Sequence, residues 1–150
     1  MSKIVLSTES VADLQKDFID KYQIQIIPMH VIMDGKDYLE SELSVEEVYD
    51  YHNRTKKIPT TTSTNEQEYH NLFSGIREKF PDSIIIHLGY TSRSSGSFQS
   101  ALMAAKEFEN LFLIDQVGYF CLPKLARFCL TVTWGEHGRA NRSERNGNHI

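Results

Sequence analysis

Three clusters of hydroxyl-bearing residues are the parts of this sequence best suited to bind a ligand. In chain order they are residues 7–10, 60–64 and 91–97, the last of which also holds a glycine. Serine and threonine hydroxyls donate hydrogen bonds, and glycine lets a ligand approach the backbone. Each cluster leads into a predicted helix, whose first N–H groups lack partners within the helix and favour an anion. The clusters therefore predict a site for a ligand with an anionic or strongly polar end.

Helix capping is the simpler explanation for some of these hydroxyls. Ser10, Ser44 and Thr64 each stand three residues before an acidic or amide side chain, which is the pattern of an N-cap. We assign these three residues to capping and not to ligand binding.

The remaining hydroxyls differ in how strongly they indicate a ligand. The run 60–63 fits a ligand contact and a threonine-rich extended linker equally well. Ser92, Ser95 and Gly96 are better candidates, although a tight turn at a helix start has a similar composition. The glycine is not followed by the lysine of a phosphate-binding loop.

Catalytic and metal-binding patterns are weak. A serine nucleophile needs an activating base, and residues 91–97 lack the G-x-S-x-G pattern. His87 lies in the apolar run 84–88, where a buried structural histidine is more frequent than a general base. The histidines are scattered singly, and Cys121 and Cys129 have no metal-ligand spacing. We expect no catalytic residue, no metal, no cofactor and no disulfide framework.

Short apolar runs alternate with helical patterns as far as residue 115. Residues 4–6, 84–88 and 111–114 have the composition of buried strands. The clearest helix follows residue 64 and carries one apolar stripe, formed by Tyr69, Leu72, Phe73, Ile76 and Phe80. Strands separated by helices predict an α/β fold of βαβ units around a mainly parallel sheet. The turns at the carboxyl ends of such strands converge on one edge, where ligands bind.

A hairpin and a further helix are expected between the first and second βαβ units. Residues 24–33 are apolar but contain Pro28, which predicts an edge or bent strand. Asp34 and Gly35 predict a turn that returns the chain through residues 36–39. The helix opened by the capping box at Ser44 is expected to end near residue 56.

Composition limits the classes of protein that fit. The chain has 150 residues, a formal net charge of -4 and 40% hydrophobic residues, which suits one ordinary folded domain and excludes disorder throughout. The mild acidity disfavours general nucleic-acid binding. With no membrane-spanning apolar run and no leader pattern, we expect a cytoplasmic protein. Residues 116–150 change character and are expected to be partly disordered.

Several motifs in order resemble those of one known family. Residues 8–14 are similar to its T-D-S-x-x-D-L motif, with Glu9 in place of the aspartate, and Ile24–Pro28 and Asp34–Tyr38 are similar to the strand and turn that follow. Residues 59–65 are loosely similar to P-T-T-S-Q-P-S. Residues 91–101 are similar to S-S-x-L-S-G-T-Y-Q-S-A, with Ser94 at a leucine position. The chain thus resembles the DegV family of fatty-acid-binding proteins, which includes the FakB-like subunits of bacterial fatty acid kinase.

The resemblance implies a binding protein and not an enzyme. Family members bind a long-chain fatty acid, and carried onto this sequence the contacts to its carboxylate fall on Thr61, Thr62 and Ser92, with Ser95 and Gly96 supporting the turn. FakB-like members present the bound acid to a separate kinase, so a fatty acid kinase is the implied partner. The acyl chain should supply most of the affinity, at about 0.8 kcal/mol per buried methylene.

The chain also departs from the family pattern. Family members are considerably longer and have a second domain, whereas residues 116–150 match nothing in it. We therefore expect a lipid-binding domain at residues 1–115, a divergent tail at 116–150, and a shortened or frame-altered chain. Two alternatives stay open: a small serine-dependent hydrolase or acyl- or phosphoryl-transfer enzyme using Ser92 or Ser95, and a truncated fragment that binds nothing.

Overall fold

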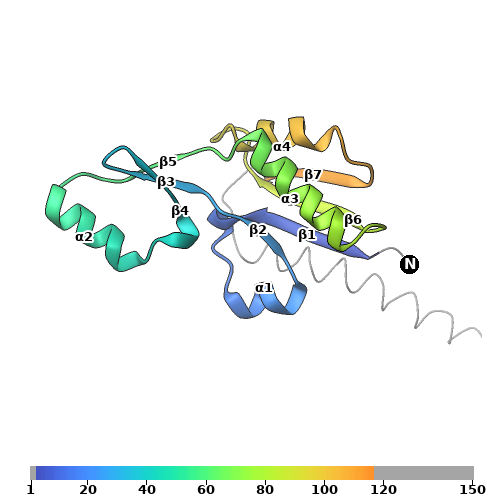
Figure 1. The fold of residues 1–150 in the computed structure, drawn as a ribbon, viewed down its shortest axis with the longest axis horizontal. Helices are drawn as coiled ribbons and strands as arrows, with labels where there is room; N and C mark the ends of the chain where they lie inside the picture. Colours follow the sequence, from blue (N-terminus) through green and yellow to red (C-terminus); the bar gives the residue numbers. More distant parts are fainter. Residues whose placement is uncertain (1–2, 117–150) are drawn as a thin grey trace, which may run out of the picture. The chain divides into compact units, whose positions relative to one another are not determined.

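Parallel strand pairing organises the larger of two sheets (Figure 1). The computed structural model describes residues 3–116. In it, β1 (Ile4–Glu9) lies between β2 (Gln25–Ile27) and β6 (Ile84–Tyr90), and β7 (Leu111–Gln116) pairs with the other edge of β6. All three pairings are parallel, which confirms the predicted α/β fold.

Helices cover both faces of this sheet. Figure 1 shows α1 (Lys16–Tyr22) on one face and α3 (Glu66–Lys79) and α4 (Ser97–Ala105) on the other. The chain runs from β1 outward to β2 and later returns to β6 on the opposite side of β1, so the strand order reverses between β1 and β6. In open α/β sheets, ligands bind outside the carboxyl ends of the strands at such a reversal. In this chain those ends are Glu9 and Tyr90.

The predicted apolar stripe of α3 packs against this sheet. Tyr69, Phe73 and Ile76 are buried. Together with residues of the strands and of α4 they form one core cluster, whose buried members are Val5, Ile27, Tyr69, Phe73, Ile76, Ile85, Ala101 and Ala104. We call the parallel sheet with α1, α3 and α4 the parallel lobe.

A second, smaller sheet is antiparallel throughout. Its strand order is β4 (Lys36–Leu39), β3 (His30–Met33) and β5 (Thr60–Thr62). Asp34 and Gly35 join β3 to β4 with φ angles of 49° and 76°, as the predicted hairpin requires. The strand β5 was not predicted, because it forms by pairing with β3 and not from a local pattern.

The helix α2 (Val45–Thr55) completes this part of the chain, which we call the small lobe. The Ser44 hydroxyl accepts a hydrogen bond from the Glu47 N–H at 3.2 Å, and the Glu47 carboxylate accepts one from the Ser44 N–H at 2.8 Å. The predicted capping box is therefore confirmed. Two short 3-10 helices, η1 (Ser10–Ala12) and η2 (Glu40–Glu42), lie in the connections.

Pro28 divides the apolar run 24–33 between the two sheets. The residues before it form β2 of the parallel sheet, and those after it form β3 of the small sheet. Proline has no N–H to donate and therefore interrupts a strand. The predicted single bent strand is in fact two strands.

Two of the predicted helix caps are wrong. The helix α1 begins only at Lys16, and the Ser10 hydroxyl instead accepts from the Met29 N–H at 2.9 Å and donates to the Glu40 carboxylate. Asn65, and not Thr64, caps α3, since the Asn65 side chain accepts from the Glu68 N–H at 3.0 Å. The Thr64 side chain is fully buried, and its hydroxyl donates to Met29 Sδ instead of capping the helix.

Some expectations concern residues beyond the described part. The partly disordered tail and the two cysteines, Cys121 and Cys129, fall in residues 117–150, outside the described residues. None of the helices in residues 3–116 has the length and hydropathy that crossing a bilayer requires.

Candidate functional site

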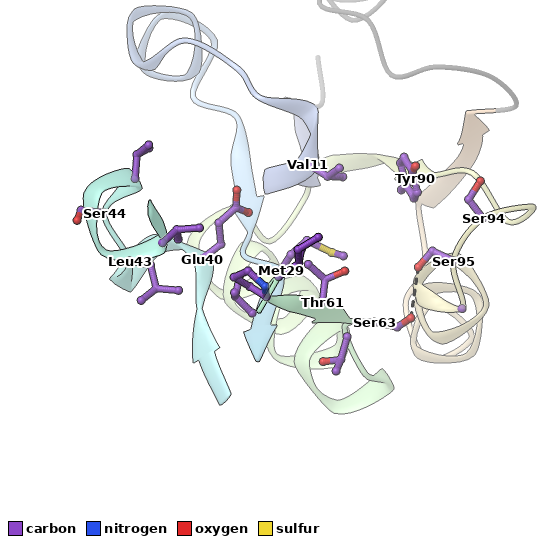
Figure 2. Close-up of a pocket in the computed structure, with 17 residues that line it drawn as sticks. Val11, Met29, Glu40, Leu43, Ser44, Thr61, Ser63, Tyr90, Ser94 and Ser95 are labelled. Carbon is purple, nitrogen blue, oxygen red and sulfur yellow. Dashed lines mark hydrogen bonds between the residues drawn. The ribbon is translucent and has the colours of Figure 1, made fainter. Parts of the chain in front are cut away.

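A cavity of about 880 Å³ lies where the small lobe meets the carboxyl ends of β1 and β6 (Figure 2). Much of its wall is apolar, including Val11, Met29, Val31, Leu43, Val48 and Ile58. Hydroxyl groups line it as well, among them those of Thr61, Thr62, Ser63, Ser94 and Ser95. The cavity therefore combines an apolar wall with a group of neutral hydrogen-bond donors, which suits a ligand that has an apolar body and a polar end.

Two segments far apart in sequence supply the hydroxyls. Of the five residues predicted to bind a ligand, four line this cavity: Thr61, Thr62, Ser95 and Gly96. The segments also touch, because the Ser63 and Ser95 hydroxyl oxygens lie 3.3 Å apart (Figure 2). Pairing of β5 with β3 positions the first segment, and the end of β6 positions the second. The two segments meet, as the sequence predicts, but the first is a strand of the small sheet and not a turn at the edge of the parallel sheet.

Ser92, the fifth predicted residue, does not line the cavity. Its hydroxyl donates to Asp115 Oδ2 at 2.5 Å, and its N–H donates to Asp115 Oδ1 at 3.0 Å. Asp115 lies opposite Gly89 in the pairing of β6 with β7, so it stands beside the turn that leaves β6. Ser92 therefore ties this turn to the neighbouring strand.

The turn from residue 91 to residue 96 is one helical turn that leads into α4. The Thr91 carbonyl accepts from the Ser94 N–H at 3.0 Å and from the Ser95 N–H at 3.3 Å. Gly96 has a φ of -73°, which any residue adopts. A Cβ placed there would meet nothing nearer than Ser63 Oγ at 3.6 Å. The backbone does not require glycine here, and a Cβ would only make an ordinary van der Waals contact with Ser63.

Sequence reasoning missed a fully buried carboxylate, Glu9, at the end of β1. One of its oxygens accepts from the Tyr69 hydroxyl and the other from the Tyr90 N–H, the latter at 2.7 Å. Burial raises the pKa of Glu9, and the two hydrogen bonds act in the opposite direction. The cluster 7–10 was predicted to be a turn, but β1 continues to Glu9. The signal in the sequence was a lone carboxylate among hydroxyls directly after an apolar run.

His87 is structural, as predicted. It is fully buried, and its Nδ1 lies 3.0 Å from the Ser7 hydroxyl. Its ring packs edge-on to Tyr69 and Phe73. Burial lowers the pKa of His87 to about 3, so the ring is neutral at physiological pH.

Within residues 3–116, the hydroxyls of the two candidate serines bond aspartate and serine side chains. The Ser92 hydroxyl bonds Asp115, and the Ser95 hydroxyl bonds Ser63 and Ser97. In this part of the chain neither serine has a histidine as a hydrogen-bond partner, and no three metal-ligating side chains gather at one point.

Comparison with family models gives one match over most of the chain. A model described as "Uncharacterised protein, DegV family" matches residues 3–118. Among curated relatives, a DegV domain-containing protein of Staphylococcus aureus is 38% identical over 112 residues, which are 73% of this chain and 38% of the relative.

Solved structures give the same result. DegV of Bacillus subtilis, described as a fatty acid binding protein, matches with a TM-score of 0.67 and 25% identity, over 77% of this chain and 41% of that one. A stearic acid-binding protein of Eubacterium ventriosum matches with a TM-score of 0.65 and 27% identity, over the same 77% and 41%. The chain spans well under half the length of these relatives.

Proposed function

The chain belongs to the DegV family, and from this membership and the cavity we propose that it binds a long-chain fatty acid. Relatives described as fatty-acid-binding proteins support the ligand class. The observation that carries the proposal is the cavity itself, in which two hydroxyl-bearing segments meet beside an apolar wall.

The carboxylate would be held by neutral donors at one end of this cavity. We assign contacts to Thr61, Thr62 and Ser95, and we assign to Gly96 the space that the headgroup needs. Ser92 would reach the carboxylate only after leaving Asp115, so its first role is to hold the turn. A hydrogen bond to a charged group contributes about 1.5–3 kcal/mol.

The acyl chain would lie on the apolar wall. Ile58 and Val45 line the cavity and are 80% and 65% exposed. Covering such side chains removes apolar surface from water, and each buried methylene of the ligand adds about 0.8 kcal/mol. Affinity should therefore grow with chain length more than with headgroup contacts.

The protein is proposed to act as a binding subunit and not as an enzyme. The cavity offers hydrogen-bond donors to a carboxylate but no histidine bonded to Ser92 or Ser95 among the described residues. Following the FakB-like members of the family, the bound acid would be presented to a separate fatty acid kinase in the cytoplasm. Formation of acyl-phosphate by such a kinase with ATP, dependent on this chain, tests that step.

Oleate uptake by the delipidated chain tests the main proposal. Native mass spectrometry should show one oleate per chain, and thermal unfolding should shift upward with oleate concentration. Oleyl alcohol, which has the same tail without the carboxylate, should bind more weakly. Failure to take up oleate contradicts the proposal, and labelling of Ser92 or Ser95 by a serine-reactive phosphonate would favour the hydrolase alternative.

A further inference from the structure

A second, smaller cavity of about 390 Å³ adjoins the proposed lipid site. Its lining residues are Ser10, Ile26, Pro28, Glu40 and Ser41. Glu40 lines both cavities, whereas Ser10 and Pro28 of the second cavity directly precede Val11 and Met29 of the first. The two cavities therefore lie on either side of a boundary at which these three segments of the chain come together.

Hydrogen bonds hold this boundary together. The Met29 N–H donates to the Ser10 hydroxyl oxygen at 2.9 Å, and the Ser10 hydroxyl donates to the Glu40 carboxylate. The Glu40 N–H in turn donates to the Met29 carbonyl at 2.8 Å. Because each of these three residues bonds the other two, the Glu40 side chain is held between the cavities.

Glu40 lies at the part of the main cavity that is remote from the proposed headgroup contacts. Figure 2 shows Glu40 and Leu43 well apart from the hydroxyl pair of Ser63 and Ser95. Among the described residues that line this cavity, Glu40 is the single charged side chain. An acyl tail that starts at the hydroxyls therefore runs along apolar side chains toward Glu40.

Glu40 opposes further entry of the tail for two reasons. Its side chain occupies the space between the two cavities, where the bond from Ser10 holds it. Methylenes that cover a carboxylate also remove it from water, which costs free energy unless new hydrogen bonds replace the lost ones, and a hydrocarbon tail offers none. Beyond Glu40, Ile26 and Pro28 are only half-buried, so the second cavity has apolar surface that a longer tail would cover if Glu40 were absent.

We propose that Glu40, held by Ser10, sets the upper limit on the length of the acyl chain that binds, an inference that rests on the proposed function. Tails that end before Glu40 gain affinity with every methylene, whereas methylenes beyond it add none. Glu40 is thus a specificity-determining residue that meets the end of the tail and not the headgroup. Removing its side chain joins the two cavities and lets a longer tail reach Ile26 and Pro28.

Competition between oleate and erucate, a longer monounsaturated acid, tests this limit. Native mass spectrometry of the delipidated chain with an equal mixture of both acids measures their relative affinity. The wild-type chain should bind erucate no more tightly than oleate. Glu40→Ala should raise the ratio of erucate to oleate affinity by about tenfold or more, because each newly buried methylene adds about fourfold. Glu42→Ala is the matched control and should leave the ratio unchanged, since Glu42 belongs to the same 3-10 helix but lines neither cavity.

The outcomes separate the length limit from the proposed function. A wild-type chain that binds oleate but prefers erucate overturns the limit and leaves the proposed function standing, whereas absence of binding of either acid overturns both. An unchanged ratio in Glu40→Ala, or an equal rise in Glu42→Ala, also overturns the limit. If circular dichroism shows that Glu40→Ala does not fold, Ser10→Ala removes the group that holds Glu40 and should raise the ratio in the same direction. A ratio that stays at the wild-type value in Ser10→Ala then overturns the limit.

Discussion

The two lobes of this chain differ in how completely they bury their apolar side chains. In the parallel lobe, Tyr69, Phe73 and Ile85 have no exposed surface. In the small lobe, Ile58 and Tyr49 are 80% and 66% exposed. The sheet of the small lobe has three strands of three or four residues, and Met33 and Tyr51 are the buried hydrophobic side chains of this lobe among the described residues. The parallel lobe therefore supplies stability, and the small lobe supplies an apolar wall that a ligand can cover.

Truncation of a large side chain in each lobe tests this division and should give the largest effect. Phe73→Ala removes a fully buried ring and should lower the free energy of unfolding by about 3–5 kcal/mol. Ile58→Ala should change it by less than about 0.5 kcal/mol, because the side chain is exposed, but should weaken oleate binding. Urea denaturation followed by circular dichroism measures the first quantity. A loss of several kcal/mol in Ile58→Ala would contradict the division.

Gly89 and Gly96 allow a second comparison, between a tightly packed position and a cavity-lining position of the parallel lobe. A Cβ at Gly89 would overlap the Phe98 ring, so Gly89→Ala should lower the free energy of unfolding by about 1–3 kcal/mol. At Gly96 a Cβ would only touch Ser63 Oγ at 3.6 Å, an ordinary van der Waals contact, so Gly96→Ala should leave stability nearly unchanged and weaken oleate binding. Thermal unfolding with and without oleate measures both effects. Unchanged oleate affinity in Gly96→Ala would show that the ligand does not approach this turn.

The family resemblance assigns the same role to the hydroxyls of Thr61 and Ser92, but alanine substitutions at these two positions should have different effects. Thr61→Ala should weaken oleate binding by about 1 kcal/mol and leave the fold intact, because Thr61 lines the cavity. Ser92→Ala should instead lower the free energy of unfolding by about 1 kcal/mol, because its hydroxyl is bonded to Asp115. Calorimetric titration of both variants with oleate makes the comparison. An equal loss of affinity in Ser92→Ala would mean that Ser92 leaves Asp115 to contact the ligand.

The sequence was sufficient to predict those elements that depend on the spacing and type of neighbouring residues. The stripe of α3, the apolar run of β6 and the capping box of α2 follow from spacing and residue type, and each is confirmed. The strand β5 was missed because Thr61 pairs with Val31, thirty residues away. A threonine run without that partner has the composition of a linker.

Contacts within the site were predictable only in part for the same reason. The position of Ser95 after the carboxyl end of β6 follows from parallel topology, whereas Thr61 reaches the same cavity because β5 pairs with β3 in the small sheet. The bond of Ser92 to Asp115 depends on β7 lying beside β6, and that of Glu9 to Tyr69 on α3 covering β1. These two hydrogen bonds depend on tertiary packing, which cannot be predicted from a local sequence pattern.

The contact between the lobes includes a titratable group, and it gives the last and smallest expected effect. His30 of β3 places Nδ1 2.8 Å from Asp37 Oδ1 and Nε2 2.6 Å from Glu68 Oε1 of α3. Both nitrogens face carboxylates, so the ring donates twice only when it is protonated. The hydrogen bond to Asp37 is the main cause that raises the pKa of His30.

The sign of the pH dependence of stability follows from the raised pKa of His30. A histidine whose pKa is raised by folding contributes its full stability below the unfolded pKa of about 6.5 and loses it as pH rises through the folded pKa. Hydrogen exchange, corrected for intrinsic rates, should therefore show β3 amides losing protection as pH rises through the raised pKa of His30, while β6 amides do not. His30→Gln should remove this dependence, and Asp37→Asn should lower the pKa of His30 in an NMR titration. If β3 and β6 lost protection together, the small lobe would be part of one cooperative core, because an opening confined to it would leave β6 protected.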